Sequence, residues 1–112
     1  MSNIIENSDF HKVNMMAGTI IDAKLNEKAI RPAYILTIDF GEHGYKTSSA
    51  QLTQNYLCED LRGKQVIAVM NFEAKRIAGI KSEVLVLAAT CHEQGTVLLH
   101  PGIKVNNGCC IA

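Results

Sequence analysis

The sequence contains no tryptophan, and three phenylalanines and three tyrosines are its only large aromatic residues. An aromatic platform, of the kind on which many RNA-binding sheets stack bases, is therefore poorly supplied. Neither sign of charge is in excess, because 11 Lys and Arg side chains are matched by 11 Asp and Glu side chains. Bulk charge therefore cannot attract nucleic acid, and any such binding requires a local basic patch.

Long apolar runs are also missing, because none approaches the ~20 residues that a membrane-spanning helix requires. The segment MSNIIENSDF at the start of the chain lacks the basic region and long apolar core of a secretory signal. We therefore expect a cytoplasmic protein. The four cysteines (Cys58, Cys91, Cys109 and Cys110) follow neither CxxC nor zinc-knuckle spacing, which predicts free thiols in a reducing compartment.

No pattern typical of a catalytic or metal site is present. None of the four histidines lies at metal-ligand spacing from a cysteine or carboxylate. No serine lies in a nucleophile elbow, and no glycine-rich phosphate loop occurs. The sequence thus predicts a protein that is not an enzyme and that needs no metal or other cofactor.

Short strands and tight turns account for most of the chain. Apolar side chains alternate through AYILTIDF (33–40), and GEHG (41–44) is typical of a hairpin turn into a returning strand, YKTSSA. QLTQNYLCEDL (51–61) has helical spacing. Two further strands, over 65–72 and 82–90, are almost continuously apolar and should be buried on both faces. The remaining expected strands cover 15–25 and 96–100.

This order of elements predicts an all-β fold. A chain of this kind must protect its sheet edges, and closure into a small barrel does so economically. Five strands with a short helix between the third and the fourth are the arrangement of the OB-fold barrel. We predict one such domain over residues 1–112, because the chain has no linker and no repeat.

A group of cations marks the first candidate binding site. Lys75, Arg76 and Lys81 lie close together in the sequence, and we expect Lys64 to lie nearby. In a loop at the mouth of a barrel, such cations could contact phosphates. They could equally be solvated, as most surface charges are.

Two further polar residues, Ser82 and Glu83, stand beside these cations. An RNA phosphate would repel the carboxylate of Glu83, which must therefore have another role. It could accept a hydrogen bond from the amino group of a base. It could also accept backbone N–H groups and brace the loop that presents the cations.

The stretch KTSSAQ supplies Lys46, Ser48, Ser49 and Gln51 as further candidates. In a strand the two serines present their hydroxyls to opposite faces, so one should lie on the barrel surface beside Asn71. Gln51 can pair with a base edge. Alternatively, either serine could cap the helix predicted after it, and one could cap while the other binds.

Four stretches resemble the tRNA-binding-domain family, the OB-fold module found at the C-terminus of methionyl-tRNA synthetases and in related tRNA-binding cofactors. Within that family the sequence is most similar to the small stand-alone CsaA-type proteins, which are described as protein-export chaperones. The spacing between the SSAQ motif and a later motif, in which NF is followed by a basic pair and then by SE, is rather specific for this family. The stretches are DFHKVNMMAGTI (9–20), RPAYILTIDFGEHGYKTSSAQLT (31–53), LRGKQVIAVMNF (61–72) and KRIAGIKSEVLVLAA (75–89).

The resemblance implies tRNA or tRNA-like RNA as a partner, with Lys75 and Arg76 in contact with it. It also implies a homodimer, in which the apolar segments IIENSDFHKV and GCCIA serve as short N- and C-terminal dimerisation extensions. Alternatively, these segments pack on their own barrel. Unfolded export precursors are a second class of partner, and the alternative function is a peptide-binding secretion chaperone with no physiological RNA ligand.

The sequence departs from the family pattern at two places. Where members commonly read D-I-R-V-G, this chain reads NMMAG, with Asn14 and Met16. The loop before the basic pair usually contains proline, and here it reads Glu73-Ala74. One cation is lost and one anion gained near the expected RNA face, so we expect weakened tRNA affinity.

Overall fold

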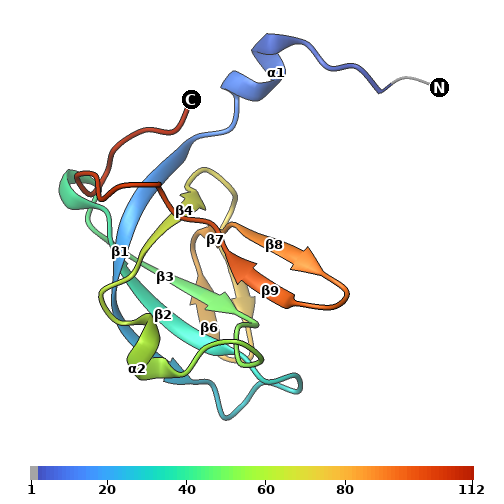
Figure 1. Ribbon diagram of the computed structural model, residues 1–112, viewed down its shortest axis with the longest axis vertical. Coiled ribbons are helices and arrows are strands. Elements are labelled where there is room, and N and C mark those ends of the chain that lie inside the picture. The colour runs from blue at the N-terminus through green and yellow to red at the C-terminus, as the bar shows by residue number, and fades with distance from the viewer. Residues whose placement is uncertain (1–2) are drawn as a thin grey trace.

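A curled antiparallel sheet of five strands forms a nearly closed barrel, in the order β3-β2-β1-β4-β7 (Figure 1). The structure is a computed structural model that describes residues 3–112. Two short hairpins, β5–β6 and β8–β9, extend from the barrel. The strands of the sheet are β1 (Met15–Leu25), β2 (Tyr34–Asp39), β3 (Tyr45–Ala50), β4 (Gln65–Val69) and β7 (Leu85–Val86). The hairpin strands are β5 (Lys75–Ile77), β6 (Ile80–Ser82), β8 (Ala88–Cys91) and β9 (Gly95–Leu98).

The long strand β1 allows the sheet to curl. Its first part pairs with β4, its second part pairs with β2, and the register with β2 shifts between Ile20 and Asp22. Such a bulge bends a strand and increases its twist. Gly18 opposes Val66 here and has no side chain because a Cβ atom would lie 2.6 Å from the ring of Phe40. The glycine thus lets a large aromatic residue fill the barrel.

The β2–β3 hairpin confirms the strongest sequence signal. Tyr34, Leu36 and Ile38 are buried, whereas the residues between them are half-buried. A single turn of 3₁₀ helix, η1 (Gly41–His43), joins the strands, with left-handed φ values of 65° at Gly41 and 81° at Gly44. The glycines fit because residues with a Cβ atom rarely adopt such values.

The expected helix over 51–61 is wrong for most of its length. Only the short helix α2 (Cys58–Leu61) forms there, between β3 and β4. The apolar residues before it pack as a turn instead: Leu52 is buried, and the Tyr56 carbonyl accepts a 2.7 Å hydrogen bond from the Tyr34 hydroxyl. Leu61 is fully buried in the core. The prediction of one short helix between the third and fourth strands of an all-β barrel is confirmed.

The expected strand over 82–90 is also wrong in detail, because it divides into β7 and β8, which belong to different sheets. Leu87 lies between them and donates its backbone N–H to Ile67 at 2.8 Å. Leu85 is 50% exposed, so this segment is not buried on both faces.

The two ends of the chain behave differently (Figure 1). The short helix α1 (Asn7–His11) projects from the barrel on an arm in which none of residues 3–14 is buried. The C-terminal segment instead lies along β1, with Ala17 N–H donating to Cys109 O at 2.9 Å and Ile111 N–H donating to Met15 O at 3.0 Å. This segment therefore packs on its own barrel. Within the described residues, no helix is both long and apolar enough to cross a membrane.

Candidate nucleic-acid interface

The predicted basic loop is a hairpin. Lys75 and Arg76 lie in β5, so their expected place in a loop is wrong. The turn between β5 and β6 is formed by Ala78 and Gly79, both with positive φ. The side-chain amide of Asn26 donates to the Ala78 carbonyl at 3.4 Å and ties this turn to the β1–β2 loop.

The register of the hairpin divides the cations between two faces. Lys75 pairs with Ser82, and both line a cavity together with Ile77. Arg76 pairs with Lys81, and the alternation of a strand turns these two side chains to the other face. Like charges directly opposite one another destabilise a sheet, and an anion between them removes that penalty.

Within residues 3–112, neither Arg76 nor Lys81 has an acidic partner. Among the described residues the ion pairs are Lys12 with Asp9 and Arg62 with Asp22. The outer face of the hairpin therefore presents two unneutralised cations to solvent, and both side chains are exposed.

Two cations that the sequence analysis missed lie beside the hairpin. Lys28 and Arg31, from the β1–β2 loop, line a hollow together with Ile77, Ala78 and Gln51. The loop NEKAIRP carries both charges in the sequence, but nothing local indicates that it lies next to residues some 50 positions later. The contact of Asn26 with Ala78 creates that neighbourhood.

The cavity on the inner face of the hairpin has a volume of about 450 Å³ and mixed chemistry. Phe72 and Leu85 contribute exposed apolar surface, 58% and 50% accessible respectively. The charged residues that line it are Lys75, Glu73 and Glu83, which gives an excess of negative charge. The cavity thus suits a neutral group, such as a nucleobase or an apolar side chain, better than a phosphate. Sequence reasoning missed Phe72, whose only signal is its place in the N-F motif.

Glu83 and Thr47 form a closed pair of hydrogen bonds. The backbone N–H of Glu83 donates to Thr47 O at 2.8 Å, and the Thr47 N–H donates to Oε1 of Glu83 at 3.0 Å. Of the two roles considered for Glu83, the structure thus contains the brace. Its second carboxylate oxygen has no hydrogen bond within the described part of the chain and remains able to accept one from a ligand.

Two serines continue the same closure of the barrel. Ser82 Oγ accepts the backbone N–H of Ser49 at 3.0 Å, and Ser48 Oγ donates to Val84 O at 2.9 Å. The two neighbouring serines lie on opposite faces of β3, as predicted, but Ser48 is only 1% exposed and cannot reach a ligand. The alternative that either one caps a helix is wrong, because α2 begins at Cys58.

Asn71 does not lie beside the serines as expected. Its Oδ1 accepts the backbone N–H of Asn14 at 2.9 Å, and its Nδ2 donates to the Lys12 carbonyl at 2.7 Å. Both ends of the amide therefore hold the start of β1 and the base of the N-terminal arm. Met16 is also away from any basic surface, since it is buried in the core.

The remaining candidates are dispersed. Lys46 is half-buried in β3, on the same side of the strand as Ser48, and Gln51 is exposed just beyond that strand. Lys64 precedes β4 and lines a separate cavity, so its expected place near Ser82 is wrong. Within residues 3–112 no three His, Cys, Asp or Glu side chains are arranged to hold a metal ion.

A family model and two crystal structures of similar proteins match this chain. A family model described as a putative tRNA binding domain matches residues 15–109. The crystal structure of chaperone CsaA from Bacillus anthracis str. Ames has a TM-score of 0.92 and 45% sequence identity, covering 97% of this chain and 99% of that one. The CsaA chaperone protein from Picrophilus torridus gives a TM-score of 0.91 and 44% identity, covering 97% and 100%.

A longer protein also matches. The methionine–tRNA ligase of Methanococcoides burtonii is 32% identical over 109 residues, which cover 97% of this chain. The chain spans only 16% of the length of that ligase. The shared part is therefore one module of a much larger protein.

Proposed function

The chain belongs to the putative tRNA-binding-domain family, and on that premise we propose that it is a cytoplasmic, non-enzymatic module that binds tRNA or tRNA-like RNA as a homodimer. The observation that carries this proposal is the pair of exposed cations Arg76 and Lys81, which lie opposite one another with no acidic partner in the described chain. Phosphates of an RNA strand would neutralise them and release counterions.

The adjoining cavity would then hold a base. The exposed ring of Phe72 supplies a stacking surface, which is how unpaired bases are commonly bound. The free oxygen of Glu83 can accept from an exocyclic amino group, and the Ser82 hydroxyl, whose oxygen accepts from Ser49, still has its proton to donate. Lys28 and Arg31 would extend the phosphate-binding surface beyond the hairpin turn.

Filter binding of tRNA over a salt series tests this proposal. Arg76→Ala/Lys81→Ala removes two phosphate contacts and should flatten the log–log salt dependence by about two units. We expect wild-type affinity in the micromolar range or weaker, about −8 kcal/mol or less favourable, because Glu73 adds an anion beside the site.

The control removes the same charge elsewhere. Lys12→Ala/Lys24→Ala deletes two exposed lysines of the arm and β1, and the salt dependence should stay close to that of the wild type. If the Arg76→Ala/Lys81→Ala protein binds tRNA as tightly as the wild type at every salt concentration, the hairpin is not the site.

A second candidate function then takes precedence. The cavity between Phe72 and Leu85 is apolar and has a net negative lining, which also suits an extended peptide with apolar and basic side chains. We therefore propose, as the alternative, a CsaA-like export chaperone that binds unfolded precursors there. Leu85→Asp should weaken the binding of an unfolded peptide, whereas Arg76→Ala/Lys81→Ala, which leaves the cavity lining intact, should not.

A further inference from the structure

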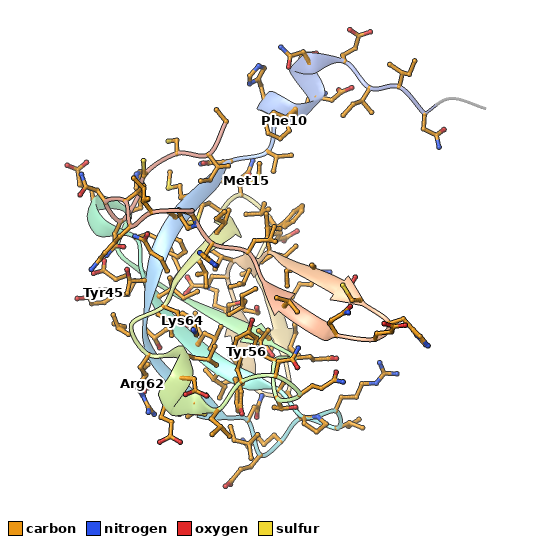
Figure 2. All side chains as sticks on the ribbon, in the orientation of Figure 1. Phe10, Met15, Tyr45, Tyr56, Arg62 and Lys64 are labelled. Atoms are coloured by element: carbon orange, nitrogen blue, oxygen red, sulfur yellow. The ribbon has the colours of Figure 1, made fainter. Side chains whose placement is uncertain are left out.

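A second cavity, of about 420 Å³, lies on a different part of the barrel. It is formed between the turn that enters β4, the end of β9 and the segment 100–104. Figure 2 shows Lys64 and Tyr56, two of its residues, on the face of the barrel that is turned toward the viewer. None of its lining residues is shared with the cavity beside Phe72.

The charges around this cavity are of one sign. Lys64 and Lys104 line it together with His100, and no aspartate or glutamate does. Neither lysine belongs to an ion pair among the described residues. In a chain of zero net charge, a hollow lined by cations without acidic neighbours attracts anions.

Hydrogen bonds hold the backbone that carries these cations. The side chain of Gln65 donates to Val105 O at 2.5 Å and accepts Val105 N–H at 3.0 Å, and thereby fixes the segment containing Lys104 against β4. Lys64 is held by its own N–H, which donates to Leu61 O at 3.0 Å, and by its carbonyl, which accepts Ile20 N–H at 2.9 Å. The two lysines therefore project from fixed backbone positions.

A neutral donor is also available. The Tyr56 hydroxyl oxygen accepts Leu98 N–H at 3.0 Å, which leaves its own proton free to donate. Nδ1 of His100 is 2.9 Å from the Pro101 carbonyl, and a carbonyl can only accept. This contact orients the His100 ring beside the cavity, where its signal can report a bound anion.

We propose that this cavity binds a phosphate group of an RNA strand through Lys64, Lys104 and Tyr56, as a contact area separate from the β5–β6 hairpin. Charge-assisted hydrogen bonds from ammonium groups to phosphate oxygens are the interaction involved. The inference rests on the proposed RNA binding for its ligand, but the anion site itself does not depend on it. A free polyphosphate offers the same chemistry, and the experiment separates the two sources.

Titration with inorganic pyrophosphate, followed by NMR, tests the site without RNA. The imidazole signal of His100, assigned by its loss in His100→Gln, should shift in a saturable way. Lys64→Gln/Lys104→Gln should weaken this binding at least about tenfold, because both charged donors are removed. Lys12→Gln/Lys24→Gln, which removes equal charge from exposed positions elsewhere, should bind as the wild type does. No saturable shift, or the same shift in the Lys64/Lys104 variant, overturns the proposal.

The salt dependence of tRNA binding identifies the source of the phosphate. Loss of one phosphate contact in Lys64→Gln/Lys104→Gln should reduce the log–log slope by about one unit. Pyrophosphate binding with an unchanged slope would overturn the RNA assignment and make the cavity a site for free polyphosphate. If the wild type binds no tRNA at all, the proposed function fails, whereas the pyrophosphate titration still decides whether the anion site exists.

Discussion

Glu83 takes part both in barrel closure, through its two hydrogen bonds with Thr47, and in the proposed ligand binding. One carboxylate oxygen accepts from the backbone at 3.0 Å, and the other is free to accept from a ligand. Bracing by a carboxylate is stronger than bracing by a neutral group, because charge-assisted hydrogen bonds are about twice as strong. The negative charge of Glu83, which would repel a phosphate, thus strengthens the hydrogen bond to Thr47 that helps to close the barrel.

Substitution of Glu83 should separate its two roles. Glu83→Ala leaves the half-buried Thr47 N–H without its acceptor and should lower the free energy of unfolding by about 1–3 kcal/mol. Glu83→Gln keeps an oxygen acceptor and should cost less, about 0.5–1.5 kcal/mol, while RNA discrimination falls. Thermal unfolding and competition binding measure the two effects. Glu73→Ala, at an exposed position in the same cavity, is the matched control, and equal stability of all three variants would exclude the brace.

Tyr34 gives the fold a dependence on alkaline pH. Burial, with smaller contributions from Cys58 and Asp60, raises the pKa of its phenol above the usual 10.0. A raised pKa means that the folded state retains the proton more strongly than the unfolded state does. The stabilising contribution is therefore complete below pH 10 and is lost as the pH rises through the folded-state pKa.

Tyr34→Phe removes the phenol hydroxyl and should therefore remove its contribution to stability. At neutral pH the variant should be less stable by about 0.5–1.5 kcal/mol, because the hydrogen bond to Tyr56 O is lost. The difference between wild type and variant should shrink in urea unfolding experiments above about pH 10. A difference that stays constant to the highest pH at which both proteins fold would contradict this expectation.

Among the elements, those defined by local patterns could be predicted and those defined by distant contacts could not. The alternation in β2 and the glycines of its turn are local signals, and the first three strands form where the sequence places them. Leu52 and Tyr56 have helical spacing, yet they pack as a turn because the barrel interior and Tyr34 supply their partners. Periodicity alone cannot distinguish these two outcomes.

The candidate site shows the same limit. Lys75, Arg76 and Lys81 could be found from their closeness in the sequence. The face that each one occupies, however, depends on the pairing of Arg76 with Lys81, which the turn at Ala78 and Gly79 determines. The barrel is closed there by Ser82 and Glu83 side chains rather than by a continuous strand ladder. No pattern in the sequence reveals such a closure.

The C-terminal segment is an element of the barrel rather than a loose tail. Three backbone hydrogen bonds join it to β1: Ala17 N–H to Cys109 O, Gly108 N–H to Ala17 O, and Ile111 N–H to Met15 O. Deleting residues 108–112 should therefore cost about 2–4 kcal/mol and lower the Tm by about 10 °C or more. Amide exchange of Ala17 should accelerate in the truncated protein, and an unchanged exchange rate would show that this pairing does not persist in solution.

At the scale of the whole molecule, the N-terminal arm is the part that the barrel leaves uncovered. Figure 2 shows Phe10 on the projecting helix. Ile4 and Ile5 lie further out on the arm and are 89% and 67% exposed. Burying such side chains stabilises a protein by about 1.5–3 kcal/mol each, so a surface that covers them is expected. A second copy of the chain, bound through a two-fold axis, is the partner that we propose.

Light scattering at micromolar concentration should give twice the 12.3 kDa mass of the chain. Ile4→Asn/Ile5→Asn should shift the protein to a monomer while the Tm of the barrel changes little, because no described residue of the arm is buried. Ile30→Asn is the matched control: this isoleucine is fully exposed in the β1–β2 loop, away from the arm, and its replacement should leave the mass unchanged. A wild-type species near 12.3 kDa would exclude the dimer. A single barrel would then bind RNA through the hairpin, since every residue proposed to contact the ligand comes from one chain.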